Sequence, residues 1–79
     1  MGIKPIPTKL FKKFLKQVGC VYIRTEGGHE IWDREDGSLL RPITLQTKNK
    51  DVPTLHIHTS LENLGISKKE FEDILSKLK

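Results

Sequence analysis

Hydrophobic positions along the chain follow two spacings, one typical of helices near both ends and one typical of strands between them. The first helical pattern begins after Thr8, which we expect to be the N-cap, and stops at Gly19. Its apolar positions are Leu10, Phe11, Phe14, Leu15 and Val18. The pattern predicts an amphipathic helix with one face packed on a core.

The second helical pattern covers residues 67–79. Ser67 and Glu70 have the spacing of a capping box. The apolar face behind them is supplied by Phe71, Ile74, Leu75 and Leu78. A second amphipathic helix is therefore expected at this end of the sequence.

Between the two helices, β-branched and aromatic residues indicate strands. Residues 20–34 read as a β-hairpin that turns at Gly27-Gly28, and Asp36-Gly37 reads as a second hairpin turn of the same kind. Residues 38–46 then alternate like a third strand, and Pro42 favours an edge position because proline cannot donate to a ladder. Three antiparallel strands in meander order are predicted.

The other segments are less regular. Residues 1–7 contain two prolines and favour an extended arm, and residues 47–53 read as a loop. Residues 55–58 read either as an extra edge strand or as an extended loop, and residues 60–65 as one helical turn. No repeat or linker divides the chain, so we expect a single α+β domain over residues 1–79. Its order would be α-β-β-β-α, with both helices on one face of a three-stranded antiparallel sheet.

Length and composition narrow the class of protein. The 79 residues fit one small domain with a thin core, and no apolar run is long enough for a membrane span or a secretory signal. The single cysteine rules out an internal disulfide framework and a cysteine-based zinc site. An intracellular, reducing compartment such as the cytoplasm is the simplest expectation, with no membrane partner.

Charge is concentrated near the N-terminus. The chain has 14 Lys and Arg against 10 Asp and Glu, a net charge of +4, and its first 25 residues hold six basic residues and no acid. Four lysines fall on the polar side of the first predicted helix: Lys9, Lys12, Lys13 and Lys16. Such a stripe favours a polyanionic partner, with nucleic acid ahead of a membrane surface. The alternative is a solvated lysine face that only maintains solubility.

His29 is the residue most suggestive of chemistry, because it directly follows two glycines at the end of a hairpin. Glycines let a phosphate approach the backbone closely, and histidine is a natural general acid or base near neutral pH. Cleavage of RNA through its 2′-hydroxyl needs such a group and no metal. The alternative is a hairpin-end histidine bonded to a cross-strand partner such as Glu26.

Other side chains carry weaker signals. His56 and His58 would share one face of a strand and could join His29 in a metal site, but ordinary surface or loop histidines are the favoured interpretation and no metal is expected. His58 is also a candidate second proton-transfer group. Tyr22 and Trp32 could stack bases beside His29, with a half-buried ring for Tyr22 and core packing for Trp32 as the alternatives. Cys20 is expected to be a small buried apolar residue and not a nucleophile.

These segments, taken in order, resemble the HicA family of mRNA interferase toxins. Family members typically show a helix ending near a glycine, an aromatic strand, a Gly-Ser-His segment followed by an aromatic residue, and a later Lys-acid-aliphatic-Pro segment. The corresponding segments here are Val18-Gly19-Cys20, Val21-Tyr22-Ile23-Arg24, Gly27-Gly28-His29-Glu30-Ile31-Trp32 and Lys50-Asp51-Val52-Pro53. The resemblance covers residues 8–53 and, more loosely, the last helix.

The resemblance implies a fold like that of double-stranded-RNA-binding domains, metal-independent cleavage of mRNA without a cofactor, and neutralisation by a HicB-like antitoxin. It places the family's catalytic histidine at His29 and the glycine before the family serine at Gly27. Gly28 stands where the family usually has serine, and the segment from Leu55 to Ile66 is additional to the family pattern. The first helix would face RNA, with phosphate contacts from its four lysines, and Arg24 and Gly28 are further candidate contacts.

Two other classes of function fit the same sequence. One is a non-catalytic RNA-binding module of the same fold, and the other is an inactive toxin relic that acts through protein interaction. His29 beside the glycine pair is the feature that separates them from a nuclease, because a binding module has no need of that histidine.

Overall fold

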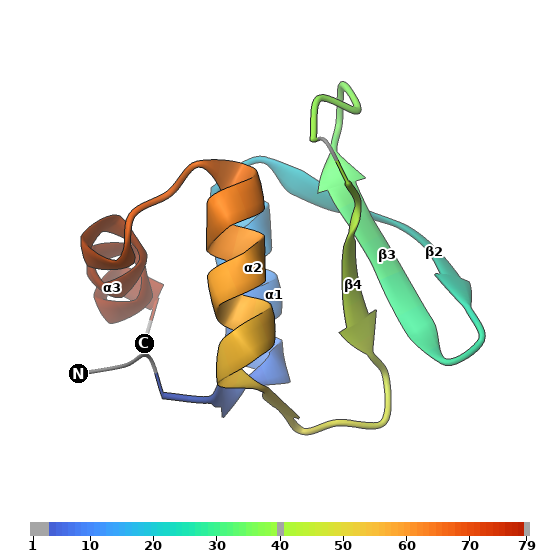
Figure 1. The fold of residues 1–79 in the computed structure, drawn as a ribbon, viewed down its shortest axis with the longest axis horizontal. Coiled ribbons are helices and arrows are strands. Elements are labelled where there is room, and N and C mark those ends of the chain that lie inside the picture. The colour runs from blue at the N-terminus through green and yellow to red at the C-terminus, as the bar shows by residue number, and fades with distance from the viewer. Residues whose placement is uncertain (1–3, 40, 79) are drawn as a thin grey trace.

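A three-stranded antiparallel sheet forms in the middle of the chain, as the alternation of residues predicts. The computed structural model describes residues 4–39 and 41–78. Strands β2 (Cys20–Glu26), β3 (His29–Arg34) and β4 (Ile43–Gln46) are hydrogen-bonded in the order β2-β3-β4 (Figure 1). The meander order and the edge position expected for the third strand are both confirmed.

The turn between β2 and β3 has the two-residue form that its glycines predict. Gly27 and Gly28 have φ angles of +56° and +82°, a region that glycine enters without steric cost. The turn sets Glu26 opposite His29. Farther along β2, a register shift between Tyr22 and Arg24 marks a β-bulge. Because a bulge adds one residue to one strand, it resets which side chains share a face.

The third strand is shorter than predicted, and its turn is not a tight hairpin. Strand pairing begins only at Ile43, so the expected strand over residues 38–46 is wrong for residues 38, 39, 41 and 42, while residue 40 lies outside the described residues. Gly37 donates its N–H to the carbonyl of Arg34 at 2.9 Å, which closes a turn, but an irregular connection follows it. Pro42 lies in that connection and cannot donate a ladder hydrogen bond, which agrees with the late start of β4.

A second, two-stranded ribbon lies near the N-terminus. Strand β1 (Ile6–Pro7) pairs with β5 (Asp51–Val52) in antiparallel register. The expected arm over residues 1–7 is therefore extended at its described end, while residues 1–3 lie outside the described residues. The predicted loop over residues 47–53 contains β5, which the sequence interpretation did not include.

Helix α1 (Thr8–Gln17) begins one residue earlier than predicted. Pro7 occupies the N-cap position and makes no side-chain cap, so the prediction that Thr8 caps the helix is wrong. The Thr8 hydroxyl instead donates to the carbonyl of Asn49 at 3.0 Å, and its N–H donates to the carbonyl of Lys50 at 2.7 Å. The stop at Gly19, with φ +89°, is confirmed.

Helix α2 (Thr54–Leu64) overturns the prediction for this segment. Residues 55–58 are neither a strand nor an extended loop, and residues 60–65 are not an isolated turn. They belong to one helix that starts after Pro53 and ends at Gly65, whose φ is +71°. The apolar side that packs inward consists of Ile57, Leu61 and Leu64.

Helix α3 (Lys68–Leu78) is the predicted C-terminal helix. The Ser67 hydroxyl accepts the N–H of Glu70 at 3.2 Å and donates to the Glu70 carboxylate at 3.4 Å, so the expected capping pair forms. Lys79, the last residue of the predicted range, lies outside the described residues.

All three helices lie on the same side of the sheet, so the described chain has one helix more than predicted (Figure 1). They enclose a single core with the inner face of the sheet. Its largest fully buried side chains are Phe11, Phe14, Leu15, Cys20, Ile57 and Phe71. The described part of the chain is thus a small α+β structure in which no helix covers the other face of the sheet. Among the described residues, no helix has the length and apolar character needed to cross a lipid bilayer.

Candidate functional site

His29 is an exposed residue at the tip of the hairpin. It is the first residue of β3 and directly follows the two left-handed glycines. Within the part of the chain that the structure describes, its imidazole has no hydrogen-bond or ion-pair partner. The alternative of a bond to Glu26 is not realised, because the Glu26 carboxylate accepts from Arg24 Nε at 2.9 Å.

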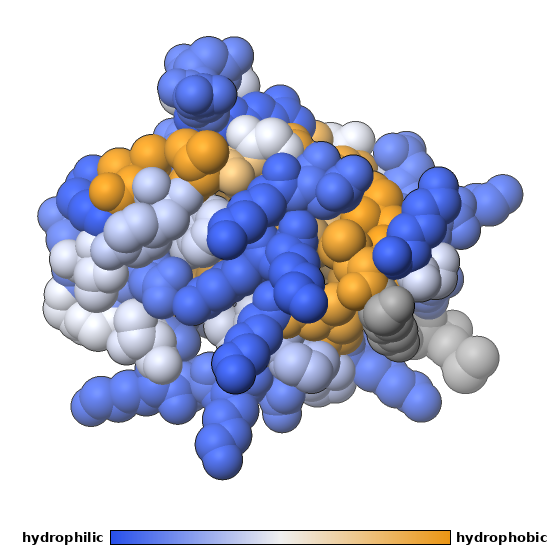
Figure 2. All heavy atoms as spheres, turned by 180° about the vertical axis from the view of Figure 1, so that it is seen from behind, coloured by the Kyte–Doolittle hydropathy of each residue, from blue (hydrophilic) through white to orange (hydrophobic). Residues whose placement is uncertain are grey.

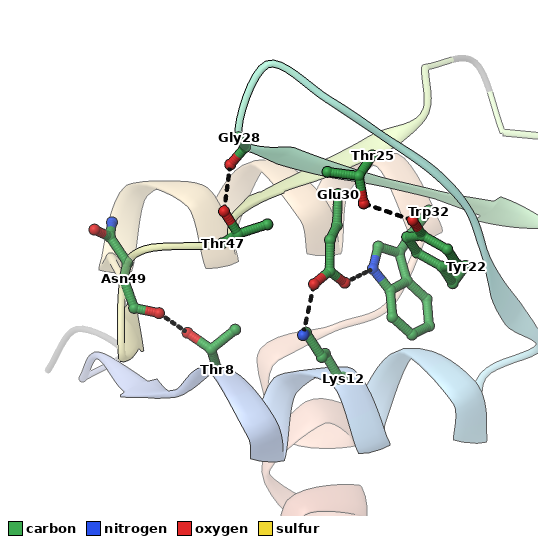
Figure 3. A network of polar contacts seen from close by, with 9 residues as sticks. All are labelled: Thr8, Lys12, Tyr22, Thr25, Gly28, Glu30, Trp32, Thr47 and Asn49. Carbon is green, nitrogen blue, oxygen red and sulfur yellow. Dashed lines mark hydrogen bonds and ion pairs between the residues drawn. The ribbon is translucent and has the colours of Figure 1, made fainter.

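The glycine turn itself is open to a ligand. A Cβ built on Gly27 or Gly28 would meet nothing within 4 Å beyond its chain neighbours. The Gly28 carbonyl is in use, because it accepts both the N–H and the hydroxyl of Thr47 at 2.9 Å (Figure 3). The turn is therefore anchored to the residue after β4 while its outer surface remains accessible, as close approach of a phosphate would require.

The alternation of β3 separates His29 from the helices. Glu30 and Trp32 point toward the helix side, so His29 and Ile31 point to the open side of the sheet. On that side Arg24 is the cross-strand partner of Ile31, and Glu26 that of His29. The structure thus brings His29 and Arg24 to one face, and it places the lysine-bearing helix behind the other.

The lysines of α1 are not equivalent. Lys9, Lys13 and Lys16 are exposed, whereas Lys12 is partly buried and reaches the sheet. Its Nζ lies 2.8 Å from Oε2 of Glu30, and the two side chains are 33% and 17% exposed. Figure 2 shows hydrophilic side chains extending over α1, with apolar surface on either side. Among the described residues, Lys9, Lys13 and Lys16 have no ion-pair partner, whereas Lys12 is committed to an ion pair.

Glu30 is a polar centre that sequence reasoning missed. Its carboxylate accepts from Lys12 through Oε2 and from Trp32 Nε1 through Oε1, at 2.8 and 3.1 Å (Figure 3). The hydrogen bond from Lys12 holds the pKa of Glu30 below its usual value, against the opposing effect of partial burial. The sequence held one signal for this role. Glu30 precedes Trp32 by two residues, so on a strand both side chains lie on the same face.

Tyr22 lies on the helix side of the sheet, away from His29. Its ring meets the Trp32 ring edge-on, with centroids 6.1 Å apart, and its hydroxyl lies 2.5 Å from Thr25 Oγ1. Tyr22 as a residue is still 50% exposed, while Trp32 is 2% exposed. Core packing of Trp32 and the half-buried ring of Tyr22 are therefore confirmed, but stacking of these rings beside His29 is not supported by the arrangement.

The other two histidines sit on α2. His56 and His58 are both exposed, and two helical residues apart they point in nearly opposite directions, so they do not share the face expected of a strand. Among the described residues there is no group of three His, Cys, Asp or Glu side chains that could hold a metal ion. His58 comes from a different element than His29, and no described contact joins the two.

Cys20 is buried at the start of β2, as expected. Burial raises the pKa of its thiol above the usual value, and the nearby Arg34 offsets this only in part. A buried thiol with a raised pKa is a poor nucleophile. The residue therefore belongs to the core and not to a candidate site.

A groove of about 660 Å³ lies between β4 and α2. It is lined on one side by residues 41–44 and on the other by α2, including the 73% exposed Leu55. Sequence reasoning could not anticipate it, because it required α2. The groove is formed by different residues from those around His29.

The comparison with protein-family models gives no match for this chain, and the comparison with curated proteins gives none either. The resemblance to the HicA family therefore stays a prediction made from the motifs of the sequence.

Proposed function

We propose that this chain is a metal-independent endoribonuclease, the toxin of a HicA-type toxin–antitoxin system, with His29 as its general acid or base. The observation that carries the proposal is the exposed imidazole of His29 directly after two left-handed, sterically open glycines. This combination offers a proton-transfer group beside a stretch of backbone that a phosphate can approach.

The proposed reaction uses the ribose 2′-hydroxyl as nucleophile. One group removes the proton from this hydroxyl and a second protonates the leaving 5′-oxygen, and histidine suits either role near neutral pH. His29 would take one of the two roles. Arg24, on the same face of the sheet, is placed to attract the phosphate as a cation, although it is shared with Glu26.

RNA affinity would come mainly from the exposed lysines of α1. Contacts of this kind bind phosphates and depend strongly on salt, but they carry no sequence information. A fold like that of double-stranded-RNA-binding domains belongs to the same proposal. The order of α1, the β2-β3-β4 meander and α3 supports it, with α2 as an additional helix before α3.

The proposed partners are mRNA and a HicB-like antitoxin protein, with no cofactor, and the proposed location is the cytoplasm. A basic toxin of this size offers an antitoxin a cationic surface that an acidic partner would match.

One observation favours a second function, a non-catalytic RNA-binding module. His29 faces the open side of the sheet, whereas the lysines of α1 belong to the helix side. A module that binds through α1 alone would not need His29. In this case RNA binding would be salt-sensitive, and a His29 substitution would leave it unchanged.

The decisive experiment is RNA cleavage by the purified protein in EDTA, beside His29→Ala and His56→Ala. Both substitutions remove an exposed histidine, but only the first lies in the hairpin. We expect the parent and His56→Ala to cleave and His29→Ala to lose cleavage while its circular dichroism stays unchanged. Equal cleavage by all three proteins would reject His29 as the catalytic group, and binding without cleavage by the parent would favour the binding module.

A further inference from the structure

We propose that the exposed ring of Tyr22 is a stacking platform for an unpaired base, next to the lysine surface of α1, and that single-stranded RNA is therefore the preferred ligand. This inference rests on the proposed function only in taking RNA as the partner. It concerns a surface on the opposite side of the sheet from His29.

The exposure of Tyr22 follows from its place in the fold. It lies on β2, an edge strand, and it is the cross-strand partner of the buried Trp32. Tyr22 nevertheless keeps half of its surface exposed on the helix side of the sheet. Half of the surface of Tyr22 is therefore available to a ligand, next to its edge-on contact with Trp32.

Two contacts hold the Tyr22 ring in place. Trp32 meets it edge-on, and the Tyr22 and Thr25 hydroxyls lie within hydrogen-bond distance (Figure 3). The bulge after Tyr22 makes the second contact possible, because it brings residues 22 and 25 to the same face of the strand. A ring that is already ordered loses little conformational entropy when a base stacks on it.

The electrostatics around the ring suit a phosphate backbone. Helix α1 has no acidic residue, and Lys16 follows Lys12 by one turn on the side that approaches the sheet. Glu30 accepts a hydrogen bond from Trp32, the ring that contacts Tyr22, and its carboxylate is paired with Lys12. The contacts run from Lys12 through Glu30 and Trp32 to Tyr22, and Lys16 is an exposed cation one helical turn beyond Lys12.

An aromatic ring beside cations is the arrangement that recognises single strands. Bases of a single strand can stack on a side chain, and every base has a suitable face. In a duplex the base faces are hidden between neighbouring pairs, so a tyrosine at the surface has nothing to stack on. The arrangement favours an unpaired strand whose backbone follows α1 while one base rests on Tyr22.

The test compares binding of the intact chain to a short single-stranded oligouridine and to an RNA duplex. Both ligands carry 2′-O-methyl groups, so neither can be cleaved through the 2′-position. Fluorescence anisotropy of labelled RNA would measure Kd. We expect Tyr22→Ala and Tyr22→Leu to weaken single-strand binding by roughly 5- to 150-fold, the range of one lost base stack. Tyr22→Phe, which keeps the ring, and Val21→Ala, a neighbouring exposed apolar site, would bind like the parent.

The salt dependence separates this role from that of the lysines. Tyr22→Leu would leave the slope of log Kd against log salt unchanged, whereas Lys16→Gln would reduce it. Intact circular dichroism of Tyr22→Leu would show that the fold survives. Equal affinity of the parent and Tyr22→Leu, or tighter binding of the duplex, would overturn the stacking site while leaving the nuclease proposal intact. Absence of any RNA binding by the parent would overturn both.

Discussion

At the scale of single residues, Glu30 makes the most consequential polar contacts of the described chain. Its carboxylate accepts from Lys12 of α1 and from the indole of Trp32. A single side chain therefore connects α1 to the sheet and holds a core ring in place. Its pKa is lowered in the folded protein. A group of this kind stabilises the fold above its unfolded pKa, and the contribution is lost as the pH falls through the folded pKa.

Glu30→Gln tests this linkage. At neutral pH we expect it to lower the free energy of unfolding by about 1 kcal/mol, a value reduced by the partial exposure of Lys12. As the pH falls below 4.5, the ordinary pKa of a glutamate, the difference from the parent should shrink, because the parent carboxylate also becomes neutral. Urea unfolding followed by the fluorescence of Trp32 would measure the difference at neutral and at acid pH.

Glu35→Gln is the matched control for this measurement, since Glu35 is exposed in the turn after β3. We expect it to leave stability unchanged at both pH values. If Glu30→Gln lowered the free energy of unfolding by the same amount in acid as at neutral pH, the loss would not come from the charge of the Glu30 carboxylate.

At the scale of elements, α2 shows where local pattern is insufficient. Its start reads Leu-His-Ile-His, which alternates like a strand, and this alternation misled the prediction. The helical signal was present farther along, in the spacing of Ile57, Leu61 and Leu64 and in Gly65 after them. Leu55 obscured this helical spacing, because it is an apolar residue that does not belong to the buried side of the helix.

Leu55 and Ile57 therefore provide a sharp test of α2. Ile57 is 0% exposed, and Ile57→Ala should cost about 2–5 kcal/mol of unfolding free energy. Leu55 is 73% exposed, so Leu55→Ala should change stability by less than about 0.5 kcal/mol. Thermal unfolding by circular dichroism would compare them. Similar losses from both substitutions would contradict the helix, because a strand over residues 55–58 would put the two side chains on one face.

The elements that could be predicted from the sequence are those whose signals are local. The glycine turn of the first hairpin, the stop of α1 at Gly19 and the capping pair of α3 each depend on residues close together in the chain. The role of Thr8 could not be predicted, because its partners Asn49 and Lys50 are distant in sequence. The place of His29 at the end of the hairpin could be predicted from its neighbouring glycines, whereas its separation from the lysines depends on the register of the sheet.

At the scale of the whole molecule, three phenylalanines join the two ends of the chain. Phe14 of α1 meets Phe71 of α3 edge-on at 4.8 Å between ring centroids, and Phe11 lies 5.6 Å from Phe14. All three rings are essentially inaccessible to solvent. Edge-on pairs of this kind add to the free energy of burial. The cluster therefore holds α3 against α1. Helix α3 lies on the side of α1 and α2 that is away from the sheet (Figure 1).

Phe14→Ala should consequently affect the entire fold. A buried phenylalanine reduced to alanine typically costs about 3–5 kcal/mol, whereas 79 residues at ordinary stability have about 4–12 kcal/mol in total. We expect the variant to unfold at much lower urea concentration than the parent, in one transition, because α1 and α3 share their core with the sheet. Val21→Ala, at a 37% exposed position, should unfold like the parent. If Phe14→Ala instead removed only a small early fraction of the helical signal, α3 would be an independent appendage and the sheet and helices would not share a single core.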